Sequence, residues 1–289
     1  MRYLQPPLPD DNAILAALSN NQRLAVRPHL QASGMEILAQ YAAYLAVSGN
    51  AVAVGAPSPL ALTAEVKELL RGCFGSEPIG LEFIAELRSK ASPEVCTMCG
   101  SLGSGTLDHI FPQSLFAELS FFSRNVVPAC SKCNSRRGNH YKGNGAERVL
   151  HPFFDSRMTD RLVRAKLAAN PTFRTPAIEL ELCVAANHPL FAAAGYHLRQ
   201  VVKDIPLSSM ESHWVNILRY PSVHFALPAG NLDADAMRAI AVAELQRLDL
   251  RRATPNNWES MLMAGIAAND PALLYLANHI NANVPPEDI

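Results

Sequence analysis

Apolar residues recur along the first ninety positions at intervals of three and four. Leu62, Val66 and Leu69, for example, fall on one side of a helix, as expected for a helix that buries one face. Ser58 followed by Pro59 is a typical helix start. The pattern predicts helices over residues 10–18, 34–47 and 81–89, and another from Ser58 onward.

The periodicity changes in the middle of the chain and again after it. Between Cys96 and about Tyr141 the helical spacing lapses, and Gly, Ser, Cys and Asn become frequent. Residues 177–184 alternate apolar and acidic side chains, which predicts a strand. Helices are then predicted over residues 189–202, 208–219, 233–248 and 256–281, the last with a break near Asn269. The expected fold is therefore mainly α, with few short strands.

The composition is that of a globular protein, with 289 residues of which 49% are hydrophobic and 18% charged. The formal net charge is −1, from 25 basic and 26 acidic side chains. Proteins that coat nucleic acid usually carry a basic excess, because phosphate neutralisation supplies most of their affinity. Any nucleic-acid site in this chain must therefore be local.

No segment predicts a membrane span. The most apolar run, residues 41–54, is interrupted by Ser48, Gly49 and Asn50 and is shorter than the roughly 20 residues that a bilayer requires. The first residues lack the apolar stretch of a secretory signal. We expect a cytoplasmic protein without a membrane partner, and in that reducing compartment paired cysteines are more often metal ligands than disulfides.

Four of the six cysteines form two pairs, Cys96 with Cys99 and Cys130 with Cys133. Two residues separate the members of each pair, so that both thiolates of a tight turn reach one ion. The spacing predicts a structural zinc ion, because four cysteines complete its tetrahedral shell and leave no position for a substrate. Disulfide pairing is the alternative, which a reducing compartment disfavours.

A polar string follows the first pair of cysteines. It reads Asp108-His109-Ile110-Phe111-Pro112-Gln113-Ser114, with Asn125 and Asn134 farther along the chain and His151-Pro152-Phe153-Phe154-Asp155 after them. Together with the cysteine pairs, these residues resemble the HNH (ββα-metal) endonucleases in their four-cysteine zinc-ribbon form, and in particular bacterial stand-alone HNH proteins. We expect an N-terminal helical region (1–92), an HNH nuclease module (93–155) and a C-terminal α-rich region (156–289).

The resemblance implies a role for each polar residue. Asp108 and Asn134 would hold one Mg²⁺ or Mn²⁺, since hard cations take oxygen ligands. The ion would polarise the scissile phosphate, and His109 would be the general base that takes a proton from the attacking water. Asn125 would orient the imidazole. Taken singly, these residues have plainer roles, such as a surface hydrogen bond or a position near a helix start.

Basic residues gather around the second pair of cysteines. Between residues 122 and 148 six basic side chains stand against Glu147 alone, which gives 6 − 1 = +5. We expect contacts with nucleic-acid phosphates, and the alternative is a solvated helix face. The residues expected to bind DNA are Arg124, Lys132, Arg136, Arg137 and Lys142.

The predicted function is metal-dependent hydrolysis of DNA, with RNA as an alternative substrate. The resemblance implies a place in bacterial anti-phage defence or restriction, which is an analogy with the family. A zinc-ribbon module that binds DNA or protein without cutting is the alternative from another class. Because one HNH site cuts one strand and the flanking helices are large enough to gate it, a homodimer or a regulatory protein partner is expected.

Overall fold

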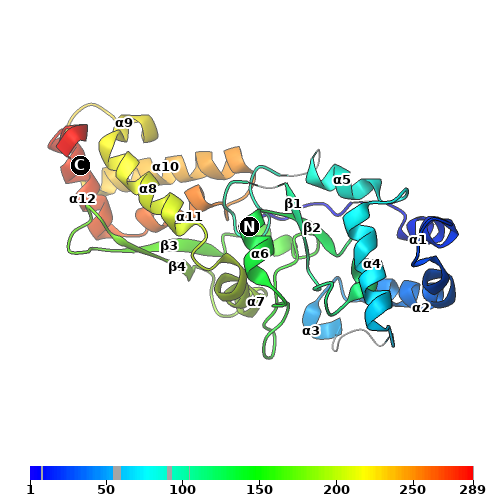
Figure 1. Ribbon diagram of the computed structural model, residues 1–289. Helices are drawn as coiled ribbons and strands as arrows, with labels where there is room; N and C mark the ends of the chain where they lie inside the picture. The colour runs from blue at the N-terminus through cyan, green and yellow to red at the C-terminus, as the bar shows by residue number, and fades with distance from the viewer. Residues whose placement is uncertain (8, 55–59, 90–92, 104, 289) are drawn as a thin grey trace.

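The computed structural model describes residues 1–7, 9–54, 60–89, 93–103 and 105–288. Its elements form three parts in a row, with the N-terminal helices at one end, a small ββα module in the centre and the C-terminal helices at the other end (Figure 1). The fold is mainly α, as the sequence predicts. The predicted helix start at Ser58 and Pro59 lies outside the described residues. No helix in the described part of the chain combines the length and apolar composition needed to cross a membrane.

Among its described residues, the N-terminal part has five helices. Asp10 caps the first of them by accepting hydrogen bonds from the backbone of Asn12 and Ala13, as a short polar residue does at this position. The second begins at Arg27 rather than at Gly34, because Pro28 suits the first turn of a helix. The helices are α1 (Asp11–Asn20), α2 (Arg27–Ala46), α3 (Ala51–Val54), α4 (Ala64–Ser76) and α5 (Glu82–Arg88).

The central module has the order strand, strand, helix. β1 (Thr106–His109) and β2 (Val126–Ala129) pair antiparallel, with Asp108 opposite Val127. The short 3₁₀ helix η1 (Ala117–Leu119) lies in the connection between them. α6 (Ser131–Arg137) follows β2 and packs against β1. Both strands are almost wholly buried, since α5 packs against them.

The C-terminal part is a helical body built on one hairpin. β3 (Val163–Ala168) pairs antiparallel with β4 (Ala177–Leu182). The strand predicted over residues 177–184 is therefore confirmed, whereas β3 was not predicted. The other elements are η2 (Ser156–Thr159), α7 (Phe191–His197), the π-helical η3 (Leu198–Val202), α8 (Leu207–Arg219), α9 (Pro221–His224), α10 (Ala234–Arg252), α11 (Trp258–Ala267), α12 (Asp270–Asn281) and η4 (Pro286–Asp288).

One helix, α11, forms the centre of this body. It packs against β3, α8, α10 and α12, and its residues from Trp258 to Ile266 are buried. Gly265 permits the contact with β3, because a Cβ at this position would lie 2.2 Å from the carbonyl oxygen of Ala165. The predicted break near Asn269 is confirmed, since the Asn269 side chain caps α12.

Candidate functional site

The four paired cysteines converge on one point. Their sulfurs all lie within 4.8 Å of one another, with Cys96 Sγ 3.9 Å from Cys133 Sγ and Cys99 Sγ 3.8 Å from Cys130 Sγ. Sulfurs bound to one tetrahedral zinc at about 2.3 Å are about 3.8 Å apart. The four side chains are buried, and none of the six cysteines is in a disulfide. The cluster therefore fits a structural zinc ion.

The backbone fixes the thiolates of this cluster. The amide of Cys130 donates to Cys96 Sγ at 3.2 Å, and the amide of Ser101 donates to Cys99 Sγ at 3.5 Å. Gly100 ends the first turn with a φ of +80°, where an added Cβ would lie 2.2 Å from the carbonyl oxygen of Asn256. The cluster is thus attached to the loop before α11 as well as to β2 and α6.

His109 ends β1 and is only 5% exposed. Its Nε2 lies 2.8 Å from the carbonyl oxygen of Ser120. Because a carbonyl oxygen only accepts hydrogen bonds, Nε2 carries the proton, and the lone pair of the neutral ring is on Nδ1. Burial lowers the pKa of His109 from its usual 6.5, against the opposing effect of the Ser120 hydrogen bond. The imidazole is therefore neutral, with a fixed tautomer.

Asp108 precedes His109 and faces α6. Its Oδ2 accepts from Nε of Arg137 at 2.7 Å, and its Oδ1 accepts from Nη2 of Arg137 at 2.6 Å. Oδ1 also accepts from the backbone amide of His109 at 2.8 Å. Both side chains are buried. Asp108 is therefore held in a bidentate ion pair with an arginine of the same module.

Asn125 lies just before β2 and is fully buried. Its Oδ1 accepts from the amide of Phe111 at 2.8 Å, and its Nδ2 donates to the carbonyl oxygens of Phe111 and Leu119, each at 3.1 Å. Asn125 thereby closes the loop between β1 and η1. Since Ser120 directly follows Leu119, this loop also positions the carbonyl group that holds His109. These hydrogen bonds join the Asn125 side chain to the loop backbone rather than to the imidazole.

Residues 96–140 match the family model of the HNH endonucleases. The match contains the cysteine cluster and the residues from Asp108 to Asn134, and it bears out the resemblance in the sequence. It supports a nuclease in general, with nucleic acid as the class of substrate. No curated protein and no solved structure matches the chain. We refer to residues 96–140 as the HNH module.

Asn134 lies on the exposed side of α6 in the HNH module. Cys133 and Arg137, four residues apart, are buried on the same helix, and residues at this spacing share a helix face. Arg137 rather than Asn134 is thus the α6 residue that reaches the carboxylate of Asp108. The structure brings Asp108 and His109 together on β1 but joins Asn134 to neither by a hydrogen bond among the described residues.

The basic residues of the HNH module have separate environments. Arg137 is buried on Asp108, and Arg124 donates to Ser123 at 2.5 Å and lies 3.4 Å from Asp11 on α1. Lys142, just after the module, lies over the ring of Tyr141. Two of the expected DNA-binding residues, Lys132 and Arg136, are exposed on α6, and Arg136 makes an ion pair of 2.5 Å with the exposed Asp204.

His151, which follows the HNH module, contacts Tyr44 of α2. Its Nδ1 accepts from the amide of Phe153 at 3.2 Å, so its Nε2 is the protonated nitrogen. Nε2 lies 2.7 Å from the hydroxyl oxygen of Tyr44, which in turn lies 3.3 Å from the carbonyl oxygen of Arg124. Burial lowers the pKa of His151 to about 3. These contacts connect Tyr44 of α2 with His151 and with Arg124, the residue before Asn125.

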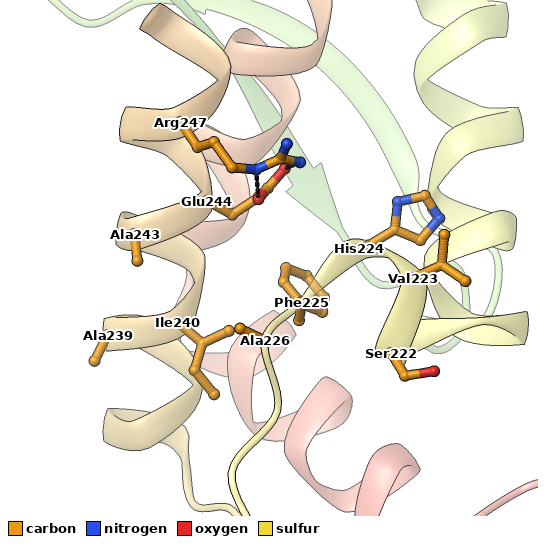
Figure 2. Close-up of a pocket in the computed structure, with 10 residues that line it drawn as sticks. All are labelled: Ser222, Val223, His224, Phe225, Ala226, Ala239, Ile240, Ala243, Glu244 and Arg247. Atoms are coloured by element: carbon orange, nitrogen blue, oxygen red, sulfur yellow. Dashed lines mark hydrogen bonds and ion pairs between the residues drawn. The ribbon is translucent and has the colours of Figure 1, made fainter. Parts of the chain in front are cut away.

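A hollow of about 660 Å³ lies in the C-terminal body, away from these residues. It lies between α10 and the segment from Ser222 to Ala226, and the Glu244–Arg247 ion pair borders it (Figure 2). None of its lining residues comes from the HNH module. It is therefore not part of the candidate nuclease site.

Two residues in contact with the site were not predicted for this place. Phe74 of α4 packs on His109, with ring centroids 4.5 Å apart, and nothing in the sequence relates two residues so far apart. Arg137 was counted among the DNA-binding residues. Its spacing of four from Cys133 could have placed it on the inner face of α6, because Cys133 must face the zinc.

Proposed function

We propose that this protein is an HNH endonuclease that hydrolyses phosphodiester bonds of DNA, with His109 as the general base. The observation that carries the proposal is the state of the His109 ring, held by the Ser120 carbonyl group with its proton on Nε2. A base that activates water needs a neutral imidazole with one lone pair in a fixed direction. His109 lies within the residues that match the family model, and it is the histidine that the resemblance implies as the base.

The resemblance further implies a Mg²⁺ or Mn²⁺ ion on Asp108 and Asn134. Carboxylate and amide oxygens are the right kind of ligand for such an ion. Both oxygens of Asp108, however, are engaged by Arg137, and Asn134 is exposed and makes no hydrogen bond to Asp108 among the described residues. The two residues do not fit a shared ion in this arrangement, and we derive no step through it.

The chain's own residues supply three parts of the proposed reaction. His109 accepts the proton of the attacking water at Nδ1, and the Ser120 carbonyl group stabilises the imidazolium that forms, because it accepts from Nε2. Asn125 keeps this carbonyl group in place by closing the loop. Lys132 and Arg136, exposed on α6, are proposed to contact the phosphates of the strand.

We place the activity in the bacterial cytoplasm, in anti-phage defence or restriction. This part of the proposal is supported by the resemblance to stand-alone HNH proteins and by cysteines suited to a reducing compartment. A single HNH site cuts one strand. A double-strand break therefore requires two successive cuts, a homodimer or a partner protein.

A second function is a zinc-ribbon module that binds nucleic acid or protein without cutting it. The specific observation in its favour is that Asp108 and His109 are both in contact with other side chains. Asp108 is paired with Arg137, and the ring of Phe74 packs against the imidazole of His109. A module that never cuts would tolerate both contacts.

The two functions are separated by a cleavage assay on the full chain. Supercoiled plasmid, linear duplex, single-stranded DNA and RNA are incubated with the zinc-loaded protein and Mg²⁺ or Mn²⁺. We expect nicking by the wild type and by His29→Ala, a change of an exposed histidine on α2, and its loss in His109→Ala. Cleavage by His109→Ala at the wild-type rate would remove His109 from its role. Survival of all four substrates would favour the non-cutting module.

A further inference from the structure

The guanidinium group of Arg137 uses all of its donors inside the HNH module. Nε and Nη2 bind the two carboxylate oxygens of Asp108. Nη2 also donates to the carbonyl oxygen of His109, and Nη1 donates to those of Ile110 at 3.3 Å and His140 at 2.9 Å. A guanidinium group has five N–H donors, and here each has an acceptor. Arg137 therefore links α6 to the end of β1 through hydrogen bonds.

The pair is sealed from water. Asp108 is 5% exposed and Arg137 is 2% exposed. A buried carboxylate requires a counter-charge, because the cost of removing it from water is large. Arg137 supplies this charge from the inner face of α6, one helical turn after the zinc ligand Cys133. The zinc cluster thus fixes the helix that carries the counter-charge.

A divalent cation on Asp108 would compete with Arg137 for the carboxylate. It would bind a carboxylate oxygen at about 2.1 Å. Both oxygens accept hydrogen bonds from Arg137, at 2.6 and 2.7 Å. The cation and the guanidinium group would also repel each other at this separation. Oδ1 accepts from Arg137 and from the amide of His109, and Oδ2 accepts from Arg137, so one acceptor position of the carboxylate remains. The positive charge of the guanidinium group disfavours a cation at that position.

We propose that Arg137 is the internal counter-ion of Asp108 and excludes divalent cations from it, so that the site accepts a cation only when Arg137 withdraws. The inference rests on the proposed function in one respect, the choice of Asp108 as the carboxylate that would bind the cation. Removal of the Arg137 charge should convert Asp108 into a cation site.

The chain contains a matched ion pair for comparison. Arg148 binds Asp155 through two hydrogen bonds, Nη1 to Oδ2 at 2.6 Å and Nη2 to Oδ1 at 2.7 Å. This pair is also largely buried, with side chains 12% and 10% exposed. It lies after the HNH module, and Asp155 also accepts from the amide of His151 at 2.6 Å. Loss of Arg148 should lower the stability of the protein, and added Mn²⁺ should not restore that stability.

The experiment measures Mn²⁺ binding and Tm on the zinc-loaded full chain. Free Mn²⁺ is followed by electron paramagnetic resonance, since the bound ion loses the signal of the hydrated one. The variants are Arg137→Met, Arg137→Met with Asp108→Asn, and Arg148→Met. Arg137→Met should bind Mn²⁺ about tenfold more tightly than wild type, or better. Its Tm should be below that of wild type without Mn²⁺ and should rise when Mn²⁺ is added.

Two controls define the origin of these changes. The double variant should lose both the tighter binding and the rise in Tm, because Asp108 no longer carries a charge. Arg148→Met should lower Tm with no rise on addition of Mn²⁺. Equal Mn²⁺ binding by wild type and Arg137→Met would overturn the proposal, as would an equal rise in Tm for Arg148→Met.

The proposal stays testable if Arg137→Met does not fold. In that case Mn²⁺ binding is measured for wild type and for Asp108→Asn. Tight binding by wild type that is lost in Asp108→Asn would overturn the proposal. Equally weak binding by both proteins would support it. Since no cleavage is measured, the outcome is independent of the nuclease assay. If Arg137→Met gains Mn²⁺ binding but the protein cuts no substrate, the inference is supported and the proposed function is not. If the protein cuts but Arg137→Met gains no Mn²⁺ binding, the proposed function is supported and the inference is not.

Discussion

The ring of Phe74 lies edge-on to the imidazole of His109, with centroids 4.5 Å apart and planes at 68°. Phe74 belongs to α4 of the N-terminal part, and the guanidinium group of Arg88 lies over its ring. α4 also packs against η1, the short helix next to Ser120. The proposed general base is therefore in contact with a helix from outside the HNH module.

Loss of this contact should expose the base. Phe74→Ala is expected to raise the nicking rate of the isolated protein and the rate at which diethyl pyrocarbonate modifies His109, because the imidazole loses its contact with the Phe74 ring. The loss of a half-buried ring should cost about 1–3 kcal/mol of stability, below the value for a core phenylalanine. Plasmid nicking and peptide mass spectrometry measure the two rates.

Phe173→Ala is the control for this prediction. Phe173 is likewise half-buried, but it packs on Tyr275 in the C-terminal body. It should lose similar stability with both rates unchanged. Unchanged rates in Phe74→Ala, or an equal increase in Phe173→Ala, would show that α4 does not shield the base.

The zinc site can be tested through its stoichiometry. Cys133→Ser should lose most of the roughly one zinc expected per chain and should unfold the HNH module, because metal binding and folding are coupled in such sites. Elemental analysis and Tm measure the two effects. Cys73→Ser, a change of a buried thiol on α4, should keep its zinc. Equal zinc content in all three proteins would contradict the assignment.

Asn125 should matter for both stability and cutting. Asn125→Ala removes three hydrogen bonds to the loop between β1 and η1, which should cost about 3 kcal/mol. Asn125→Asp keeps an acceptor for the amide of Phe111 but has no donor for the two carbonyl oxygens, so it should be nearly as unstable. Denaturant unfolding and plasmid nicking test the prediction, and wild-type nicking by Asn125→Ala would contradict the positioning role.

The stability of the protein should fall in acid partly because of His151. Its pKa is about 3 in the folded protein and about 6.5 when unfolded. Between these values the unfolded state binds a proton that the folded state does not, so stability falls as the pH is lowered from about 6.5 toward 3. This residue should contribute about 1.4 kcal/mol per pH unit at the steepest part.

The contribution of His151 is isolated by comparing variants. His151→Gln should unfold more easily than wild type at pH 7, because the contact with Tyr44 is weakened, but its stability should decline less steeply with acid. His29→Gln, on the exposed side of α2, should keep the wild-type slope. Parallel pH profiles for wild type and His151→Gln, measured by urea unfolding, would be the contrary result.

The helices and the zinc cluster could be predicted because their signals are local. Asp10 caps α1, Asn269 caps α12, and the spacing of two within each cysteine pair is set by the size of the ion. β3 was not predicted, although its sequence alternates apolar and basic side chains from Val163 to Leu167 and it pairs with β4 over Val163–Ala168. Strand pairing depends on the partner, which local periodicity does not contain.

The sequence by itself determined the chemistry of the centre of this protein: four thiolates at zinc spacing, an Asp-His pair and an asparagine in the order of the HNH motif. Only the tertiary structure decided what each of these side chains contacts. It placed Arg137 on Asp108, Phe74 on His109 and the loop backbone on Asn125. The reason is physical, since a motif fixes which groups are present, whereas burial and counter-charge depend on packed helices that bring distant segments together.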